Sequence, residues 1–406
     1  MSAEIGYLKM MEKKTGTRFL EAYKNRQTNL ETLRIFAMLM IIVFHIVSHC
    51  IVIQLTDKIS IDALNNGWFN TPAFARKLMA VEAVMPWGAT GNAIFILLTG
   101  YFLCGKPMGL EKCAKSAKKL MWQLGYVILL LVSVSCIYGS LKKEEAYQVA
   151  FINLKAFSGS FWFAGYYCLI LLVAACFLNR MISRYNRIQF KSFLIVILAS
   201  FSFYWSGALI DSLASGMRTL FAGIFLYAMG GYIRKYSPFE RLRTWFVVIL
   251  IPLIYLVIMI SYHNVVMSEV MEYQISGGRG EFIQVVPGFV NYEIVPLVLG
   301  ILIFELFRRM RIPRSAVINY ISSGVFMIYL LHDNPFVYGI WKETDWITVL
   351  YQEPGRYLLI LSEWTLVVFG LGFAGYLFYR GLIRLLNWGS RFVLLPANEE
   401  SGQQLL

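Results

Sequence analysis

Long apolar stretches separated by short polar loops recur along most of the chain. Each is about 20 residues long, the length of helix that crosses the hydrocarbon core of a bilayer. The pattern therefore predicts an all-α, polytopic transmembrane helical bundle of about ten spans, with a tight turn at Asp211 and Ser212 between the fifth and sixth. The predicted spans are 33–53, 84–104, 120–140, 161–180, 192–210, 216–233, 245–262, 291–307, 315–332 and 356–380.

The connecting loops alternate in charge. The loops near 106–119, 180–191, 234–243, 308–314 and 380–391 are basic, whereas those near 57–62, 142–145, 269–281 and 342–353 are mixed or acidic. Short cytoplasmic loops of membrane proteins carry an excess of lysine and arginine. The basic loops are therefore predicted to be cytoplasmic, and an even number of spans places both termini on that side.

The bundle accounts for nearly the whole chain. We expect a cytoplasmic N-terminal segment at 1–29, a transmembrane domain at 30–385 and a cytoplasmic C-terminal tail at 386–406. The longest polar stretches, the N-terminal segment and the outer loop near 264–290, are too short and polar to bury a core of their own. Any chemistry is therefore expected within the membrane bundle.

Composition excludes several classes of protein. Hydrophobic residues make up 58% of the 406 residues and charged residues 15%, against roughly 25% charged in soluble domains. The net charge of +13 does not indicate nucleic-acid binding, because its excess lies in the loops. The six cysteines form no C-x-x-C pair, so neither a disulfide framework nor a cysteine zinc site is indicated.

Ionisable side chains within the first predicted span are the main candidates for chemistry, because a charge at membrane depth is costly and marks function. Arg34 and His45 are eleven positions apart, which places them within about 20° of one helix face and about 16 Å apart along it. His49 follows one turn further out. The spacing of His45 and His49 suits a metal, but no third ligand is evident nearby in the sequence, and we predict no metal site.

Other interpretations of these residues stay open. Arg34 would equally be a snorkelling residue, and His45 a packing residue bonded to a neighbouring helix. His49 would be an interfacial residue. His332, beside Asp333 at the outer end of a late span and somewhat shallower than His45, is a secondary candidate. Arg218 is another, or else an interfacial anchor.

The pattern resembles acyltransferase family 3, whose members O-acylate cell-surface glycans. Arg34 and His45 resemble the family's signature of an arginine and a histidine separated by ten residues in an apolar helix. Thr99 stands where the family's second-span motif has a serine. Four segments are similar to other family motifs, and the first of them contains Thr99. They are AIFILLTGYFL (Ala93–Leu103), SFWFAGYYCLILL (Ser160–Leu172), RTLFAGIFLYAMGGYI (Arg218–Ile233) and YLLH (Tyr329–His332).

The resemblance implies a multi-pass enzyme of the cell membrane, embedded in the lipid bilayer, with acyl-CoA as donor and a cell-surface glycan or lipid-linked glycan as acceptor. Acetyl-CoA is the expected donor substrate, and no permanently bound cofactor is expected. In this hypothesis Arg34 holds a CoA phosphate or polarises the thioester carbonyl. His45 acts as general base on the acceptor hydroxyl, or carries the acyl group transiently. Basic residues that would help bind the CoA phosphates are Lys115, Lys118 and Lys119.

Two other functions remain compatible with the sequence. A transporter or flippase of glycan or lipid-linked intermediates would use the same histidine and arginine as proton-relay or anion contacts. A non-catalytic membrane assembly partner would not need His45 at all. Acyl transfer by the protein, or its absence, separates these classes.

Overall fold

The computed structural model describes Tyr23 and residues 25–54, 79–105, 110–142, 161–202, 208–276, 294–352 and 354–393. These ranges are mostly helical, with short turns between the helices, and contain no strand. In a bilayer every backbone polar group needs an internal partner, which an apolar helix supplies. The principal helices are α2 (Thr28–Ile46), the π-helix η1 (Val47–Ile51), α6 (Pro86–Leu103), α7 (Leu110–Leu141), α9 (Trp162–Val173), η2 (Ala174–Leu178), α10 (Asn179–Arg184), α11 (Arg187–Ser202), α12 (Ala208–Tyr236), α13 (Thr244–Ser276), α15 (Ile294–Arg309), α16 (Ala316–Ser322), α17 (Val325–His332), α18 (Pro335–Lys342), α19 (Trp346–Gln352) and α20 (Pro354–Val393).

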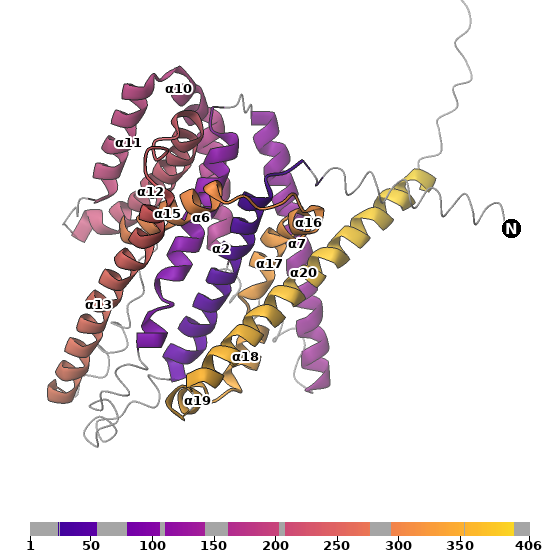
Figure 1. Ribbon diagram of the computed structural model, residues 1–406. Helices are drawn as coiled ribbons and strands as arrows, with labels where there is room; N and C mark the ends of the chain where they lie inside the picture. Colours follow the sequence, from indigo (N-terminus) through magenta and orange to yellow (C-terminus); the bar gives the residue numbers. More distant parts are fainter. Residues whose placement is uncertain are drawn as a thin grey trace, which may run out of the picture.

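Helix α2 lies at the centre of the bundle (Figure 1). It packs against α6, α15, α16, α17 and α20. Helix α12 packs on α6, and α11 packs on α12. The long helices α13 and α20 run along the outside of the bundle. A residue on α2 is therefore surrounded by helices drawn from most of the chain.

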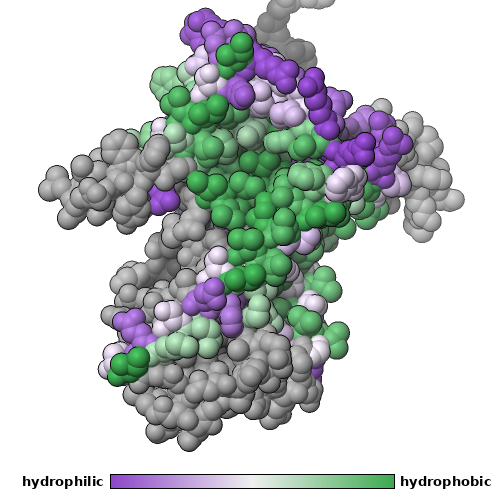
Figure 2. Space-filling model, turned by 60° about the vertical axis from the view of Figure 1, so that its left-hand side comes forward, coloured by the Kyte–Doolittle hydropathy of each residue, from purple (hydrophilic) through white to green (hydrophobic). Residues whose placement is uncertain are grey.

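Apolar side chains cover the outside of the bundle. Figure 2 shows an apolar surface over the middle of one face, with hydrophilic residues mainly at the upper end and a few toward the lower end. By length and composition, six helical segments of the described chain can cross a membrane, and Ala316–His332 is a shorter apolar segment. The six are Thr28–Gln54, Met79–Leu103, Ala114–Leu141, Trp162–Arg184, Thr244–Ser261 and Gly355–Leu386. The chain is a helical membrane protein, and the count of ten spans stays a prediction.

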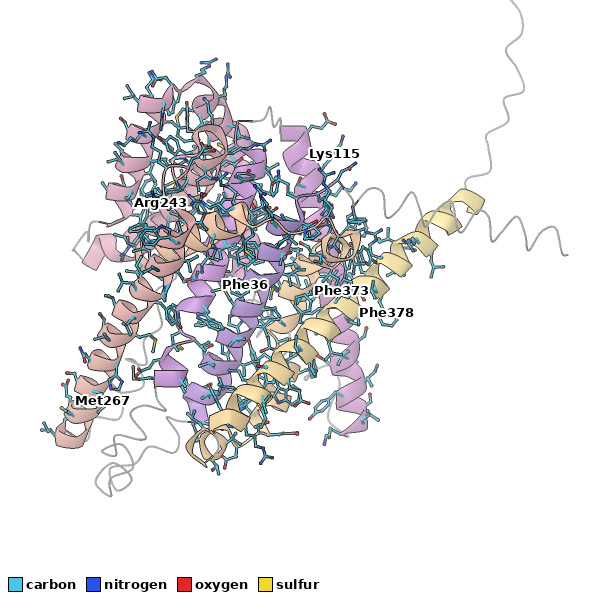
Figure 3. All side chains as sticks on the ribbon, in the orientation of Figure 1. Phe36, Lys115, Arg243, Met267, Phe373 and Phe378 are labelled. Carbon is cyan, nitrogen blue, oxygen red and sulfur yellow. The ribbon has the colours of Figure 1, made fainter. Side chains whose placement is uncertain are left out.

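The two sets of loops lie at opposite ends of the bundle where the structure describes them. Lys115 and Arg243, which belong to two of the segments predicted as basic loops, lie toward the same end (Figure 3). Met267, on the far part of α13, lies toward the other end. This arrangement agrees with the grouping of the loops by charge. The cytoplasmic position of both termini remains a prediction from the positive-inside rule.

Two details of the predicted spans are wrong. Asp211 and Ser212 lie inside α12 rather than in a tight turn. Aspartate and serine lower helix propensity only modestly, so this polar pair does not end the helix. The stretch 315–332 is two helices, α16 and α17, joined at Ser323 and Gly324. Gly324 lies against α20, where a Cβ would press on Phe373 and Tyr376.

Small residues allow α6 and α12 to approach closely. A Cβ built on Gly100 would overlap the backbone carbonyl of Tyr227, and one on Gly230 would overlap that of Leu97. In membranes, helix association depends on such backbone approach because lipid removes the hydrophobic driving force between helices. This contact holds α12 on one side of α6, while α2 packs on α6 as well. Thr99 is therefore carried by a helix that is fixed in place.

Candidate functional site

Both ends of α2 are anchored by side-chain hydrogen bonds. At the start, the Asn29 amide donates to the carbonyls of Phe307 (3.0 Å) and Arg308 (3.2 Å), near the end of α15. Beyond η1, the Gln54 amide donates to the carbonyl of Thr344 (2.8 Å) and accepts from the Trp346 N–H (2.9 Å). The helix that carries Arg34, His45 and His49 is thus held at both ends, as a preorganised site requires.

The end of α17 is determined by local sequence. A proline disfavours the helical conformation in the residue that precedes it, and here Asn334 precedes Pro335. The Asn334 side chain accepts from the N–H groups of Phe336 (3.1 Å) and Val337 (3.2 Å), and so caps α18. The helix therefore stops at His332, and the sharp link brings His332 and Asp333 against α2.

His45 and His332 form a direct contact between α2 and α17. Nδ1 of His45 lies 2.7 Å from Nε2 of His332, and the two rings stack at 4.8 Å between centroids. Nδ1 of His332 lies 2.6 Å from the Tyr329 carbonyl oxygen. His332 is fully buried. The sequence placed His332 shallower than His45, whereas the structure places the two rings side by side.

This chain of contacts determines the proton positions when both rings are neutral. A carbonyl oxygen only accepts, so Nδ1 of His332 carries the proton and donates to Tyr329. Nε2 of His332 is then bare and accepts from Nδ1–H of His45. Nε2 of His45 is consequently left with a free lone pair. The buried partner thus sets the tautomer of the more accessible ring.

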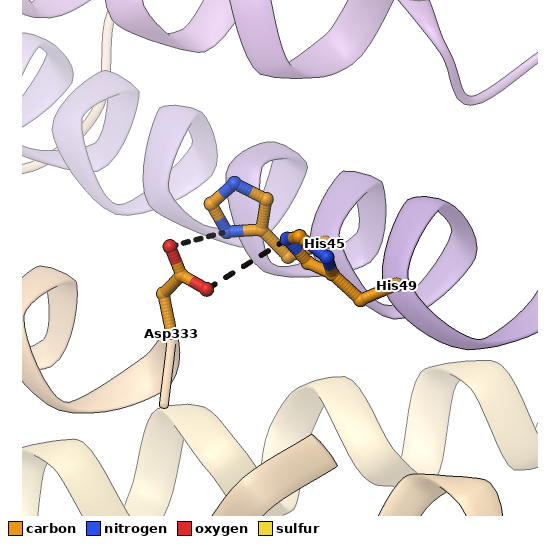
Figure 4. Close-up of side chains that lie close together, drawn as sticks. All are labelled: His45, His49 and Asp333. Atoms are coloured by element: carbon orange, nitrogen blue, oxygen red, sulfur yellow. Dashed lines mark ion pairs between the residues drawn. The ribbon is translucent and has the colours of Figure 1, made fainter. Parts of the chain in front are cut away.

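Asp333 and His49 complete the outer cluster (Figure 4). The Asp333 carboxylate lies 4.0 Å from Nδ1 of His45 and 3.8 Å from Nε2 of His49. His49, in η1, also packs its ring on Tyr338 at 4.7 Å between centroids. Asp333 is 8% exposed, and its Oδ1 has no hydrogen-bond partner among the described residues. The π-helical turn that carries His49 is of a kind often found at functional sites.

The inner part of α2 holds a separate ionic cluster around Arg34. Nη1 of Arg34 donates to Oε2 of Glu31 at 2.5 Å, and Glu31 is 5% exposed. The Ser322 hydroxyl of α16 donates to the same oxygen at 2.5 Å. Arg26 lies 3.5 Å from the other oxygen. The carboxylate of Glu31 therefore neutralises and orients the Arg34 guanidinium.

The segment that resembles the family's second-span motif also contacts its fourth-span counterpart. The Thr99 hydroxyl lies 2.8 Å from the Phe95 carbonyl and 3.2 Å from the Tyr167 hydroxyl. A threonine hydroxyl has the same donor and acceptor capacity as the serine it replaces. The departure from the family's serine thus keeps the polar contact between α6 and α9.

The structure does not bring the remaining sequence candidates to these clusters. Arg218 donates through Nε to the Phe201 carbonyl at 3.0 Å and so ties α12 to the end of α11. Lys115 is paired with Glu111 at 2.7 Å on the exposed first turns of α7. Lys118 and Lys119 are exposed on the same helix. A role of these lysines in binding acyl-CoA stays a prediction.

Sequence reasoning missed three residues of the inner cluster, Glu31, Arg26 and Ser322, and the role of Asp333 in the outer cluster. Glu31 precedes Arg34 by three positions, a spacing that places both on one helix face, and this signal was available. Ser322 comes from a different helix and had no such signal. Asp333 was noted only as the neighbour of His332, and its position opposite His49 depends on the link between α17 and α18.

Comparison with known proteins identifies a family. The sequence profile of a family described as an acyltransferase domain, acyltransferase family 3, matches residues 27–380. This range contains α2, α6, α16, α17 and most of α20, and with them both clusters except Arg26. Neither the curated proteins nor the solved structures give a significant match to the chain.

Proposed function

The chain belongs to acyltransferase family 3, and from this premise we propose that it is a membrane O-acyltransferase. It moves an acyl group from cytoplasmic acyl-CoA, with acetyl-CoA as the expected donor, to a hydroxyl of a cell-surface polysaccharide or its precursor. The observation that carries the proposal is the hydrogen-bonded chain from His45 through His332 to the Tyr329 carbonyl. It leaves one ring nitrogen of His45 ready to accept a proton.

The proposed step is direct transfer with His45 as general base. Nε2 of His45 takes the proton of the acceptor hydroxyl while the oxygen forms a bond to the thioester carbonyl carbon. The carbon–sulfur bond breaks, and the thiolate of CoA leaves. The proton on His45 then passes to the thiolate sulfur, so that the enzyme returns to its starting state.

His332 and Asp333 support this step in different ways. His332 holds the tautomer of His45 through its bare Nε2. Asp333, 4.0 Å from His45, supplies a negative charge that stabilises the imidazolium formed during transfer. In this arrangement His45 is the base and His332 is the group that orients it, as in other enzymes that use a general base.

Arg34 has a role distinct from that of His45. The two side chains are separated by eleven residues of uninterrupted helix, or about 16 Å. One thioester carbonyl cannot touch both, so of the two roles predicted for Arg34 we favour binding a CoA phosphate. A guanidinium suits a phosphate because its planar fork donates in pairs. The extended pantetheine arm would then run along α2 toward His45.

The test compares ester content of surface glycans by NMR in cells with and without the gene. Wild-type protein is expected to restore the ester signal to deficient cells. His45→Ala is expected to lower transfer by roughly 10²–10⁴-fold, the usual contribution of a general base. His263→Ala is the matched control, because His263 lies on α13 and contacts Glu82 at 3.3 Å rather than a residue of either cluster. Immunoblots of the membrane fraction confirm equal amounts of each variant.

Three outcomes would count against the proposal. Restoration of the ester by His45→Ala would refute the general base. An ester content that does not depend on the gene would refute acyl transfer. Movement of the acceptor across the membrane without ester formation would identify a transporter or flippase instead.

A further inference from the structure

The outer cluster presents three potential metal ligands from two separate elements. His45 and His49 lie on the continuous helix formed by α2 and η1, and Asp333 lies in the link after α17. One ligand atom from each residue lies within 4.8 Å of the other two (Figure 4). The structure thus supplies the third ligand that was not evident nearby in the sequence.

The gaps within this cluster suit a bound ion better than direct contacts. The nitrogen–oxygen distances of 4.0 Å to His45 and 3.8 Å to His49 exceed the roughly 3.2 Å limit of a hydrogen bond. Two ligands held about 2.1 Å from a tetrahedral ion lie about 3.4 Å apart. Two groups bridged by one tetrahedral water at about 2.8 Å would lie about 4.6 Å apart. The 3.8 Å gap between the Asp333 carboxylate and Nε2 of His49 is closer to the first spacing.

The buried carboxylate is an independent reason to expect a cation. Asp333 is 8% exposed, and its Oδ1 has no hydrogen-bond partner in the described part of the chain. A buried carboxylate oxygen without a partner is unfavourable. Because Nδ1 of His45 donates to His332, Nε2 is the nitrogen left to hold an ion, and the contact with His332 orients the ring from behind.

We propose that His45, His49 and Asp333 bind one divalent transition-metal ion, for which Zn²⁺ is the best fit. Two imidazoles and a carboxylate form a common zinc ligand set, and solvent takes the fourth position. Mg²⁺ and Ca²⁺ fit less well because they prefer oxygen ligands. The proposal departs from the expectation, made from the sequence, that the chain binds no metal.

Binding of this ion has a consequence for acyl transfer that rests on the proposed function. A neutral imidazole that ligates through one nitrogen carries its proton on the other. Whichever nitrogen of His45 holds the ion, no lone pair remains to accept the proton of the acceptor. Zn²⁺ is therefore expected to inhibit transfer, and a chelator to restore it.

The binding test uses full-length protein in nanodiscs, stripped with EDTA and titrated with Co²⁺ and then Zn²⁺. We expect one Co²⁺ per protein with the visible spectrum of a tetrahedral site, displaced by Zn²⁺. His49→Ala and Asp333→Asn should each weaken binding at least about tenfold, since each removes a ligand. His263→Ala, which changes the other histidine that lies beside a buried carboxylate, should leave binding unchanged. Thermal unfolding without metal shows that each variant is folded.

The results separate this site from the proposed activity. Unchanged affinity in folded Asp333→Asn, or an equal loss in His263→Ala, would overturn the metal site. Ion binding without any acyl transfer would leave the metal site standing and refute the enzyme. Acyl transfer that requires Zn²⁺ would overturn the inhibition and the role of His45 as base.

Discussion

The two ends of α2 carry polar clusters of opposite character. At the inner end, the Glu31 carboxylate accepts from Arg34 and Ser322 at hydrogen-bond distance, so the buried charge is compensated. At the outer end, Asp333 lies 3.8–4.0 Å from two histidines, and its Oδ1 has no hydrogen-bond partner among the described residues. One helix therefore presents a completed ion pair and an incomplete cluster about 16 Å apart.

The difference indicates what each end can do. The guanidiniums of Arg34 and Arg26 share the single Glu31 carboxylate, so the inner cluster keeps a net positive charge in a fixed place, which suits binding of an anion. A cluster with a bare ring nitrogen and an unpartnered carboxylate oxygen can instead accept a proton or a cation. We therefore assign positioning to the inner end and reaction to the outer end. The following changes test this division, from the largest expected effect to the smallest.

His332→Leu should lower kcat by on the order of 10²-fold or more, because His45 loses the acceptor that holds its tautomer. The KM for acyl-CoA should change little, since the inner cluster is untouched. His332→Gln places an amide oxygen near the lost Nε2 and should recover part of kcat. Kinetics of purified protein in proteoliposomes measure both constants.

A role of His332 in packing alone predicts a different result. Leucine and glutamine would then both disturb packing at the buried position, and the kcat of His332→Gln would not exceed that of His332→Leu. Equal kcat for the two variants, with equal thermal stability, would contradict the positioning role.

Arg34→Lys should raise the KM for acyl-CoA about tenfold and leave kcat within about threefold. Lysine keeps the charge but loses the planar fork, at a cost comparable to one charge-assisted hydrogen bond. Arg26→Lys is the matched control, because Arg26 is more exposed and lies 3.5 Å from the same carboxylate. A fall in kcat with unchanged KM would place Arg34 at the reacting carbonyl instead.

Replacing Lys115, Lys118 and Lys119 together by glutamine should raise the KM for acyl-CoA less than about twofold at physiological salt. These lysines are exposed, and solvent and salt screen exposed charges strongly. The effect should grow when ionic strength is lowered to about 10 mM, where screening is weaker, and kinetics at two salt concentrations would reveal it. A large effect at both concentrations would show direct contact with the donor.

Hydrophobic patterning predicted the helices well. All ten predicted apolar stretches overlap helices of the described chain, because a bilayer-spanning helix is recognised from its own residues alone. The breaks were harder to predict. Gly324 separates α16 from α17 at the point where α20 packs against Gly324. No local sequence pattern predicts a contact with a helix so distant in the sequence.

The sequence by itself determined the helical membrane fold, the family motifs, and the placement of Arg34 and His45 on one face of α2. These properties follow from composition and from the 3.6-residue repeat, which act within one segment. Only the tertiary structure decided that His332 sets the tautomer of His45, that Ser322 binds Glu31, and that Asp333 faces His49. Such contacts join segments almost 300 residues apart in the chain, and they depend on helix packing and on the link between α17 and α18.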